Sequence, residues 1–588
     1  MSHRLIIAVL SILLFSCEEK KEDKVADFQT QFEISKGTET ATYLQTVDFY
    51  IQLAREFPEI NIQTIGETDS GNPLHIVTFN NDADFNFRRV GEEKIVILIN
   101  NGIHPGEPDG IDATMLLYRD LATGKLTAPE KTVLVTIPIY NIGGALNRNS
   151  LTRANQNGPE SYGFRGNEKN YDLNRDFIKS DTKNARTFAE IFHLVKPDIF
   201  IDNHVSNGAD YQYTLTHLFT QHNKLGGQLG DYLHEEMMPR LENSLVRDKW
   251  DITPYVNVFN RVPESGFSQF MDHPRYSTGY VALWNTLGLM VETHMLKPYR
   301  QRVVGTYQLM KQIINIAETD GKKIKQLRNA ALTRHRAWSN YPVQWAVDTT
   351  KSSLLHFKGF EADTLVSQVT GFSRLKYDRD RPFTKKVVYQ NYYKPIDSVP
   401  IPEAYIIQKG YDELIDLLEL NQIVYQTLEK DTLLPVESYK INSYKTSQNA
   451  YEGHYPHYDT SVLVERESVL FSEGDYVVLT DQPGFRYIME TLEPAAVDSF
   501  FNWNFFDAIL QQKEGFSPYV FEDRAAEMIK NDSVLKEAFD RKKISDTAFA
   551  SNWYAQLDWI FKKSEFYEPA HLQYPVYRFP KEKKKATN

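Results

Sequence analysis

Four polar residues that could bind a metal ion or move a proton lie far apart in this sequence. His104 and Glu107 fall in the stretch IHPGEPDG, His204 ends the stretch DIFIDNH, and Glu292 lies in GLMVETH. A zinc ion that performs chemistry takes its protein ligands from imidazole nitrogen and carboxylate oxygen, and it leaves one position to water. His104, Glu107 and His204 would supply such a ligand set. Glu292 would then be the base that takes a proton from the bound water.

Each of these residues follows a stretch that we interpret as a buried strand. Residues 94–100 (KIVILIN), 198–202 (DIFID) and 287–291 (LGLMV) are short apolar runs. Runs of this kind are typical of strands buried on both faces of a mostly parallel sheet. Because open α/β sheets bind ligands at the carboxyl ends of their strands, we expect the four residues to meet at one edge of one sheet.

Each candidate also has an ordinary explanation when it is taken alone. A histidine and a glutamate three residues apart recur by chance in many chains. His204 could be a hydrogen-bonded loop histidine, and Glu292 could be a buried carboxylate paired with a cation. The joint interpretation is favoured because all candidates lie at strand ends.

Residues 32–320 resemble the zinc carboxypeptidases of the carboxypeptidase A family. The pattern of that family is HxxE, then DxNR, then a distant histidine and a glutamate on a late strand. All four parts occur here in order, and residues 170–177 (NYDLNRDF) carry the second. The resemblance implies that the three candidate ligands bind one zinc ion per chain and that Glu292 is the catalytic glutamate.

The resemblance also implies how a substrate is held. Asn174 and Arg175 match the pair that binds the terminal carboxylate of the substrate. Asp172 matches an acid that hydrogen-bonds the first ligand histidine and so sets its tautomer. A planar guanidinium fork on a free carboxylate favours the removal of one residue from a chain end.

Two positions of the family pattern stay open. Arg153 is the candidate for the arginine that polarises the scissile carbonyl, with Arg148 and Arg165 as nearby competitors. The substrate-capping tyrosine could be Tyr276 or Tyr280, and neither spacing is persuasive. The side-chain preference at the cleaved residue is open as well.

The function that we expect is hydrolysis of the C-terminal peptide bond of peptides with a free C-terminus. One alternative is a zinc amidohydrolase of the aspartoacylase or succinylglutamate desuccinylase type, which shares the HxxE, DLNR and distant histidine pattern. Another is a carboxypeptidase that acts on the peptide stems of murein. A third is an inactive protein that uses the groove to bind peptides.

Composition and length agree with a large enzyme. At 588 residues the chain is longer than one core usually supports. The net charge of −12, with no basic stripe, argues against nucleic acid as a partner. The expected organisation is a signal peptide (1–17), a flexible tether (18–30), a catalytic domain (31–320), a connecting helix (321–345), an accessory domain (346–580) and a basic tail (581–588).

The N-terminal sequence indicates a location outside the cytoplasm. Residues 5–15 form an apolar stretch of signal-peptide length, and Cys17, the one cysteine of the chain, follows it. The run Leu14, Phe15, Ser16, Cys17 resembles the lipobox of bacterial lipoproteins. We therefore expect a lipid anchor on a bacterial membrane, at its periplasmic face or at the cell surface. The alternative is an ordinary secretory signal with an incidental cysteine.

The catalytic half alternates predicted helices and strands. Leu44, Val47, Ile51 and Ala54 recur at helical spacing. Further elements are expected as strands at 74–79 and 132–140 and as helices at 183–195 and 299–316. This alternation predicts a mixed, mostly parallel twisted sheet flanked by helices.

Beyond residue 345 the sequence predicts a β-rich accessory domain without a catalytic motif. Strand-like runs occur at 386–389, 404–407 and 461–464, and a helix is expected at 522–542. His454 and His457 lack a third ligand, so we interpret them as surface or packing residues.

Overall fold

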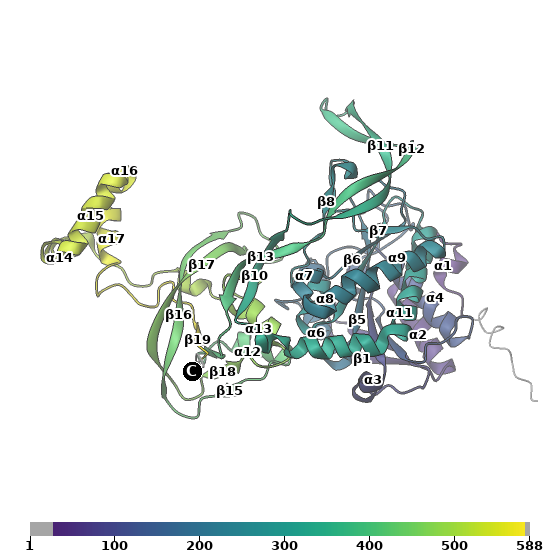
Figure 1. Ribbon diagram of the computed structural model, residues 1–588, viewed down its shortest axis with the longest axis horizontal. Helices are drawn as coiled ribbons and strands as arrows, with labels where there is room; N and C mark the ends of the chain where they lie inside the picture. Colours follow the sequence, from purple (N-terminus) through teal and green to yellow (C-terminus); the bar gives the residue numbers. More distant parts are fainter. Residues whose placement is uncertain (1–27, 582–588) are drawn as a thin grey trace, which may run out of the picture.

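The computed structural model describes residues 28–581, and its catalytic half is built on one eight-stranded sheet (Figure 1). The strand order is β1-β2-β4-β3-β5-β9-β6-β7. Strands β4, β3, β5 and β9 run parallel to one another, whereas β1, β2 and β6 pair antiparallel. The predicted fold class, a mixed and mostly parallel sheet with helices around it, is confirmed. The strand bounds are β1 (Ile60–Glu67), β2 (Pro73–Phe79), β3 (Ile95–Asn100), β4 (Thr132–Ile137), β5 (Ile199–Ser206), β6 (Leu215–Phe219), β7 (Ile252–Pro254) and β9 (Leu287–His294).

Helices cover both faces of this sheet. The side chains of β5 alternate between the faces: Phe200 packs against Phe188 of one helix, and Asn203 contacts Met310 of another. This explains why every residue of β3 is buried. The helix bounds are α1 (Gln31–Ile34), α2 (Tyr43–Glu56), α3 (Phe87–Glu93), α4 (Asp109–Ala122), α5 (Ile142–Leu146), α6 (Lys183–Val195), α7 (His222–Leu225), α8 (Gly227–Tyr232), α9 (Met238–Arg247), α10 (Ser277–Val281) and α11 (Tyr299–Arg334).

Two strands are longer than the sequence indicated. The run at 198–202 becomes β5, which extends to Ser206, and the run at 287–291 becomes β9, which extends to His294. His204 and Glu292 therefore lie within their strands and not just beyond them. The polar ends of β5 and β9 were missed because only the apolar residues of each strand follow the pattern that predicts a buried strand.

Helix α2 presents to the core a face that coincides only in part with the one expected. Leu44 is 67% exposed, whereas Tyr50 and Leu53 are fully buried. The aromatic Tyr50 contacts α4, where its ring meets that of Tyr118 edge to face, and Val47 and Ala54 pack against the same core. The predicted closing and connecting helices are one continuous helix, α11, of 36 residues.

The second half is β-rich, as predicted. β10 (Asn340–Val347) pairs with β13 (Tyr393–Pro400), and a six-stranded sheet has the order β15-β18-β14-β19-β16-β17. Its strands are β14 (Ala404–Ile407), β15 (Gln426–Thr427), β16 (Thr432–Thr446), β17 (His457–Phe471), β18 (Tyr476–Leu479) and β19 (Val576–Phe579), and its helices are α12 (Asp412–Leu420) and α13 (Phe485–Leu492).

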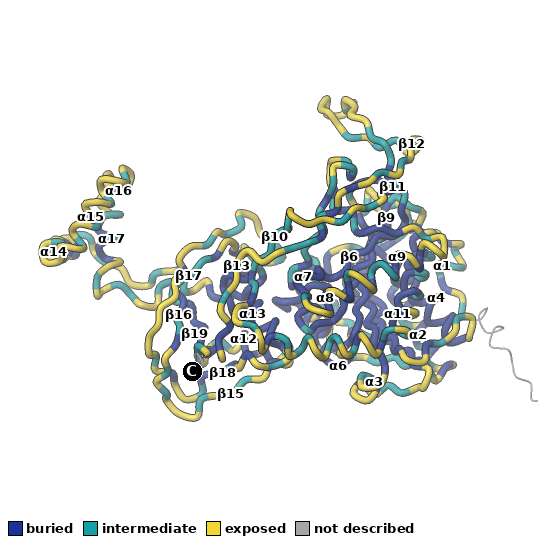
Figure 2. The backbone as a smooth tube through the Cα atoms, viewed as in Figure 1, coloured by how far each residue is buried: buried dark blue, intermediate teal, exposed yellow. Residues whose placement is uncertain are grey.

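A small helical module projects from this second half, and most of its backbone is exposed or intermediate (Figure 2). It consists of α14 (Pro518–Asn531), α15 (Ser533–Ser545), α16 (Thr547–Ala550) and α17 (Trp553–Phe561). The single helix predicted at 522–542 is thus two, because the side chain of Asp532 accepts hydrogen bonds from the backbone N–H groups of Val534 and Leu535 and starts a new helix.

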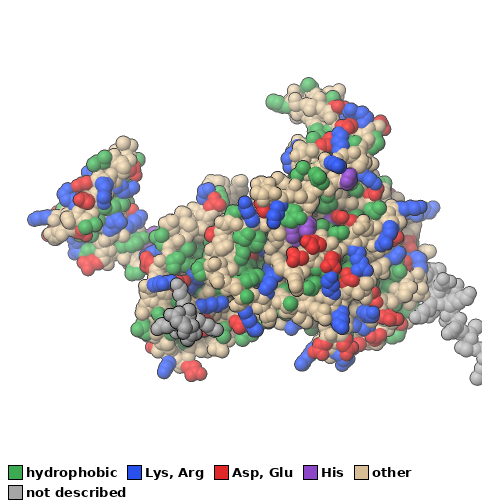
Figure 3. Space-filling model, in the orientation of Figure 1, with side chains coloured by type: hydrophobic (Ala, Val, Ile, Leu, Met, Phe, Trp, Pro, Cys, Tyr) green, Lys and Arg blue, Asp and Glu red, His purple; other side chains and the backbone are tan. Residues whose placement is uncertain are grey.

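The two halves share one hydrophobic core. The hairpin of β11 (Ser353–Val366) and β12 (Ser373–Gln390) adds to β8 (Phe267–Ser268) of the catalytic half. Trp284 packs against Tyr487 of α13, and the hydroxyl of Tyr280 donates to Asn421. Acidic and basic side chains are interspersed over the face drawn in Figure 3.

Several expectations fall outside the residues that the structure describes. These are the signal peptide, the lipidation of Cys17, most of the tether and most of the basic tail. Within residues 28–581, no helix combines the length and the apolar character needed to cross a membrane.

Truncation after Ala337 should yield insoluble or loosely packed protein. The cut removes Tyr487 and Phe485, which are 0% and 2% exposed, and so uncovers the aromatic side chains packed beneath them. Size-exclusion chromatography and thermal unfolding would measure the effect, with removal of residues 582–588 as the control. A truncated protein that is monomeric and unfolds cooperatively would contradict the shared core.

Candidate metal centre

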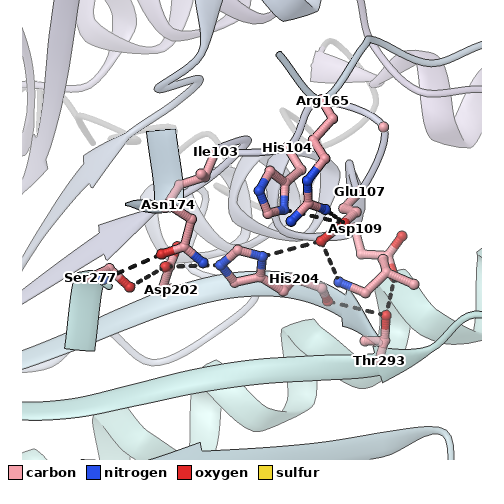
Figure 4. A network of polar contacts seen from close by, with 12 residues as sticks. Ile103, His104, Glu107, Asp109, Arg165, Asn174, Asp202, His204, Ser277 and Thr293 are labelled. Carbon is pink, nitrogen blue, oxygen red and sulfur yellow. Dashed lines mark hydrogen bonds and ion pairs between the residues drawn. The ribbon is translucent and has the colours of Figure 1, made fainter. Parts of the chain in front are cut away.

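Three of the predicted residues come together at the edge of the sheet. His104, Glu107 and His204 are buried, and they offer ligand atoms that all lie within 4.8 Å of one another. The Nδ1 atoms of His104 and His204 lie 3.3 and 3.1 Å from the two oxygens of Glu107 (Figure 4). Both rings therefore turn the same nitrogen towards one point.

The chain segment between β3 and α4 places the first two of these side chains. Gly102 has a φ of +65°, which only glycine adopts without strain, and it turns the chain out of β3. The backbone N–H of Glu107 then donates to the carbonyl of His104 across a tight turn (2.8 Å). Glu107 also accepts a hydrogen bond from the backbone N–H of Val205 (2.9 Å), which ties this turn to β5.

A carboxylate binds each histidine ring on the side away from the cluster. Nε2 of His104 lies 2.8 Å from Asp172, and Nε2 of His204 lies 2.9 Å from Asp202. A proton on Nε2 satisfies both contacts and leaves the Nδ1 lone pair free for a metal. Asp202 was missed in the sequence, although its place two residues before His204 on a strand puts both on one face.

The donor set fits zinc. Nδ1 of His104 is buried and has no hydrogen-bond partner among the described residues. An unpartnered buried nitrogen is costly unless a ligand completes it. Two imidazoles and a carboxylate are the ligands of catalytic zinc sites, so His104, Glu107 and His204 would hold such an ion.

The acids of the cluster stay ionised. Burial alone would raise the pKa of Glu107, but the charge of Arg153 and then of His104 overcomes it and holds the pKa well below its usual range. For Asp172, likewise, burial is outweighed by His104, Arg175 and Arg165, and the pKa is lowered. The centre therefore offers negative charge to a cation.

Glu292 lies beside the cluster on the neighbouring strand. It is the register partner of His204 in the parallel pairing of β5 with β9, so the two residues point to the same face. Burial, followed by the charges of Glu107 and Asp202, raises the pKa of Glu292 to about 8. A bound cation would oppose these charges and lower that pKa.

The residues expected to hold a carboxylate lie next to Asp172. Asn174 lies in the 3₁₀ turn Leu173–Arg175, and its side-chain oxygen accepts a hydrogen bond of 3.3 Å from the backbone N–H of Ser277. The guanidinium of Arg175 lies 4.7 Å from the centre of the Tyr276 ring. Tyr276 therefore lies close to the site, where its ring packs against the guanidinium group of Arg175.

Tyr280 does not reach the site, and its assignment as a substrate contact is wrong. The residue is fully buried, packs on Trp284, and donates its hydroxyl to Asn421. It belongs to the core between the two halves. A helical position four residues after Tyr276 points back into the protein here, because α10 packs against β9 and β5.

Of the three candidate arginines, two reach the cluster. Nη1 of Arg153 lies 2.8 Å and Nη1 of Arg165 3.6 Å from the same oxygen of Glu107. Arg165 is the more exposed, at 42% against 18%, and also binds Asp172 at 2.9 Å. Arg148 donates instead to the carbonyls of Thr40, Ala41 and Ser161 and lies apart.

Tyr255 is a candidate that sequence reasoning missed. It directly follows β7, and its hydroxyl has no hydrogen-bond partner among the described residues. Burial raises its pKa well above 10, and the charges of Glu292 and Glu107 raise it further. No motif marks this residue, since β7 has only three residues and carries no clear strand pattern.

His454 and His457 serve other contacts, as expected. His454 pairs with Asp181 at 2.8 Å, and His457 pairs with Asp507 at 3.0 Å. Neither belongs to a group of potential metal ligands within residues 28–581.

The comparisons with known proteins agree with this chemistry. Residues 46–197 match the family model described as zinc carboxypeptidase. Carboxypeptidase 2 of Trichophyton rubrum is 23% identical over 433 residues, which are 69% of this chain and 73% of that protein. Carboxypeptidase 2 of Trichophyton equinum is 23% identical over 444 residues, with the same shares.

Solved structures are similar to this chain at lower sequence identity. A metallo-carboxypeptidase from Burkholderia cenocepacia has a TM-score of 0.35 and 15% identity, covering 47% of this chain and 70% of its own. The carboxypeptidase A from Helicoverpa armigera has a TM-score of 0.37 and 13% identity, covering 51% and 80%.

Residues 46–197 are thus similar to zinc carboxypeptidases, and the comparisons support an enzyme of the metallocarboxypeptidase class. Both of these Trichophyton relatives are fungal, and the bacterial lipid anchor expected from Cys17 stays a prediction.

Replacing Asp202 by Asn should weaken zinc binding by about 10- to 100-fold, because it removes the charge that orients His204 and raises its basicity. Titration against a competing chelator would measure this. Asp231→Asn, at an exposed position, is the matched control. An unchanged zinc affinity in Asp202→Asn would show that Asp202 has no such role.

Proposed function

We propose that this protein is a zinc-dependent carboxypeptidase that hydrolyses the C-terminal peptide bond of peptides. The single observation that carries the proposal is the link through Asp172, which binds the ligand histidine His104 at 2.8 Å and lies 3.8 Å from Arg175. The candidate metal ligands and a guanidinium group that could bind a free carboxylate are thus neighbours. The name of the fungal relatives, carboxypeptidase 2, supports the same assignment.

When bound, zinc would supply an acidified water and polarise the scissile carbonyl. Glu292 would act as the general base that takes a proton from the attacking water and then as the general acid that gives it to the leaving amine. A bound cation would lower the raised pKa of Glu292 towards the range in which a carboxylate can both take and release a proton.

The remaining residues bind and orient the substrate. Arg175 and Asn174 hold the terminal carboxylate, which sets the distance from the chain end to the cluster. Arg153 or Arg165 donates to the carbonyl oxygen as negative charge develops on it, an interaction worth about 3 kcal/mol in a dry site. Tyr255, whose pKa is affected by the charges of Glu292, Glu107 and Arg175, would be a further contact for the bound chain.

Glu292→Gln should keep its zinc but lose about 100- to 10,000-fold in kcat, because the amide cannot accept the water proton. Metal analysis and steady-state kinetics on one peptide measure both quantities. Glu130→Gln, on the exposed surface, is the control. A near wild-type rate in Glu292→Gln would exclude Glu292 as the base.

Amidation of the C-terminus of a peptide should reduce kcat/KM by at least about a hundredfold, since pairing of a carboxylate with a largely buried arginine is worth about 3 kcal/mol. Mass spectrometry of the products shows whether one residue is lost. Arg175→Gln should cleave the acid and the amide at similar rates. Equal rates on both forms by the wild type would indicate an endopeptidase or an amidohydrolase.

A further inference from the structure

The turn between β16 and β17 brings the second half of the chain into contact with the catalytic site. Residues 447–456 form this turn, and Glu452 lies at its tip. The backbone N–H of Asp172 donates to Oε2 of Glu452 at 2.7 Å, across 280 residues of sequence. Asp172 is the residue that orients His104, so Glu452 stands one residue away from the candidate metal centre.

This turn is held rigidly. The backbones of Tyr451 and His454 exchange hydrogen bonds of 3.1 and 2.8 Å, and the Tyr451 ring stacks on Trp503. His454 pairs with Asp181 of the catalytic half. Gly453 has a φ of +80°, and a Cβ there would fall 2.6 Å from the hydroxyl of Tyr171. Only glycine fits this close approach, so the position of Glu452 is determined by the fold.

Glu452 is a carboxylate that feels the charges of Lys179 and Arg175 but has no direct salt bridge. It is partly buried, and it forms no ion pair with any residue in the described part of the chain. The nearby cations are occupied otherwise: Lys179 bonds Asp176, and Arg175 lies over the Tyr276 ring. Burial raises the pKa of Glu452 and the charge of Asp172 adds to this, whereas the charges of Lys179 and Arg175 oppose the rise only in part.

We propose that Glu452 selects substrates whose C-terminal residue carries a cationic side chain, of the lysine or arginine class. This inference rests on the proposed function, in which Arg175 binds the terminal carboxylate. Glu452 accepts from the backbone three residues before Arg175, so the terminal residue held by Arg175 meets a negative charge beside it. An ammonium or guanidinium group would complete the ion pair that Glu452 lacks. The second half of the chain thereby contributes a specificity residue.

Two peptides that end in lysine or in norleucine test this inference, because their side chains differ in the ammonium group. We expect the wild type to prefer the lysine peptide by about tenfold or more in kcat/KM, the effect of about 1.4 kcal/mol of charge pairing. Glu452→Gln, which can still accept from Asp172 N–H, should lower the ratio of the two kcat/KM values by about tenfold. Glu452→Lys should favour a peptide that ends in glutamate.

Glu465→Gln, on an exposed position of the same hairpin, is the control and should keep the wild-type ratio. Thermal unfolding and zinc content establish that each variant is folded and loaded. The inference is overturned if the wild type shows no preference for lysine, or if Glu452→Gln slows both peptides equally, as a purely structural role would. An enzyme that shortens none of the peptides would contradict the proposed function itself, and this inference with it.

Discussion

The orientation of two imidazole rings is the constraint on which the candidate centre depends. Asp172 and Asp202 each hold Nε2 of a candidate ligand histidine, so Nδ1 of both rings faces Glu107. These acids are themselves held: Arg165 binds Asp172, and Ser277 donates to Asp202. The tautomers of His104 and His204 are therefore set by Asp172 and Asp202, whose positions are fixed in turn by Arg165 and Ser277.

A second constraint is a buried ion pair behind the cluster. Asp109, two residues after Glu107, binds Arg302 of α11 at 2.9 Å and accepts a hydrogen bond from Thr293, which follows Glu292. Arg302 is fully buried and also donates to the carbonyls of Asn157 and Gly158. Losing one partner of such a pair costs about 3–5 kcal/mol. The pair thus fixes the segments that carry the candidate ligand Glu107 and the proposed base Glu292.

Local pattern predicted the parts of the molecule that local chemistry determines. The strand at 404–407 and the helix at 183–195 have the predicted bounds, because apolar runs and helical spacing are properties of neighbouring residues. The face of α2 was predicted only in part: Val47 and Ala54 pack against the core, but the more deeply buried aromatic positions also recur at helical spacing and were not recognised. Tyr280, Tyr255 and Glu452 could not be placed, since their surroundings come from segments far away in the sequence.

The contact between Asp172 and Glu452 has a consequence for biosynthesis. Chains leave the ribosome N-terminus first, so the metal ligands emerge long before the turn at Glu452. Contacts between residues so distant in sequence form slowly. Side chains of α13 and β14 belong to the same hydrophobic core as the first half, so we expect the candidate metal centre to be complete only after the second half has folded. The proposed peptidase would then stay inert towards neighbouring chains while it is being made.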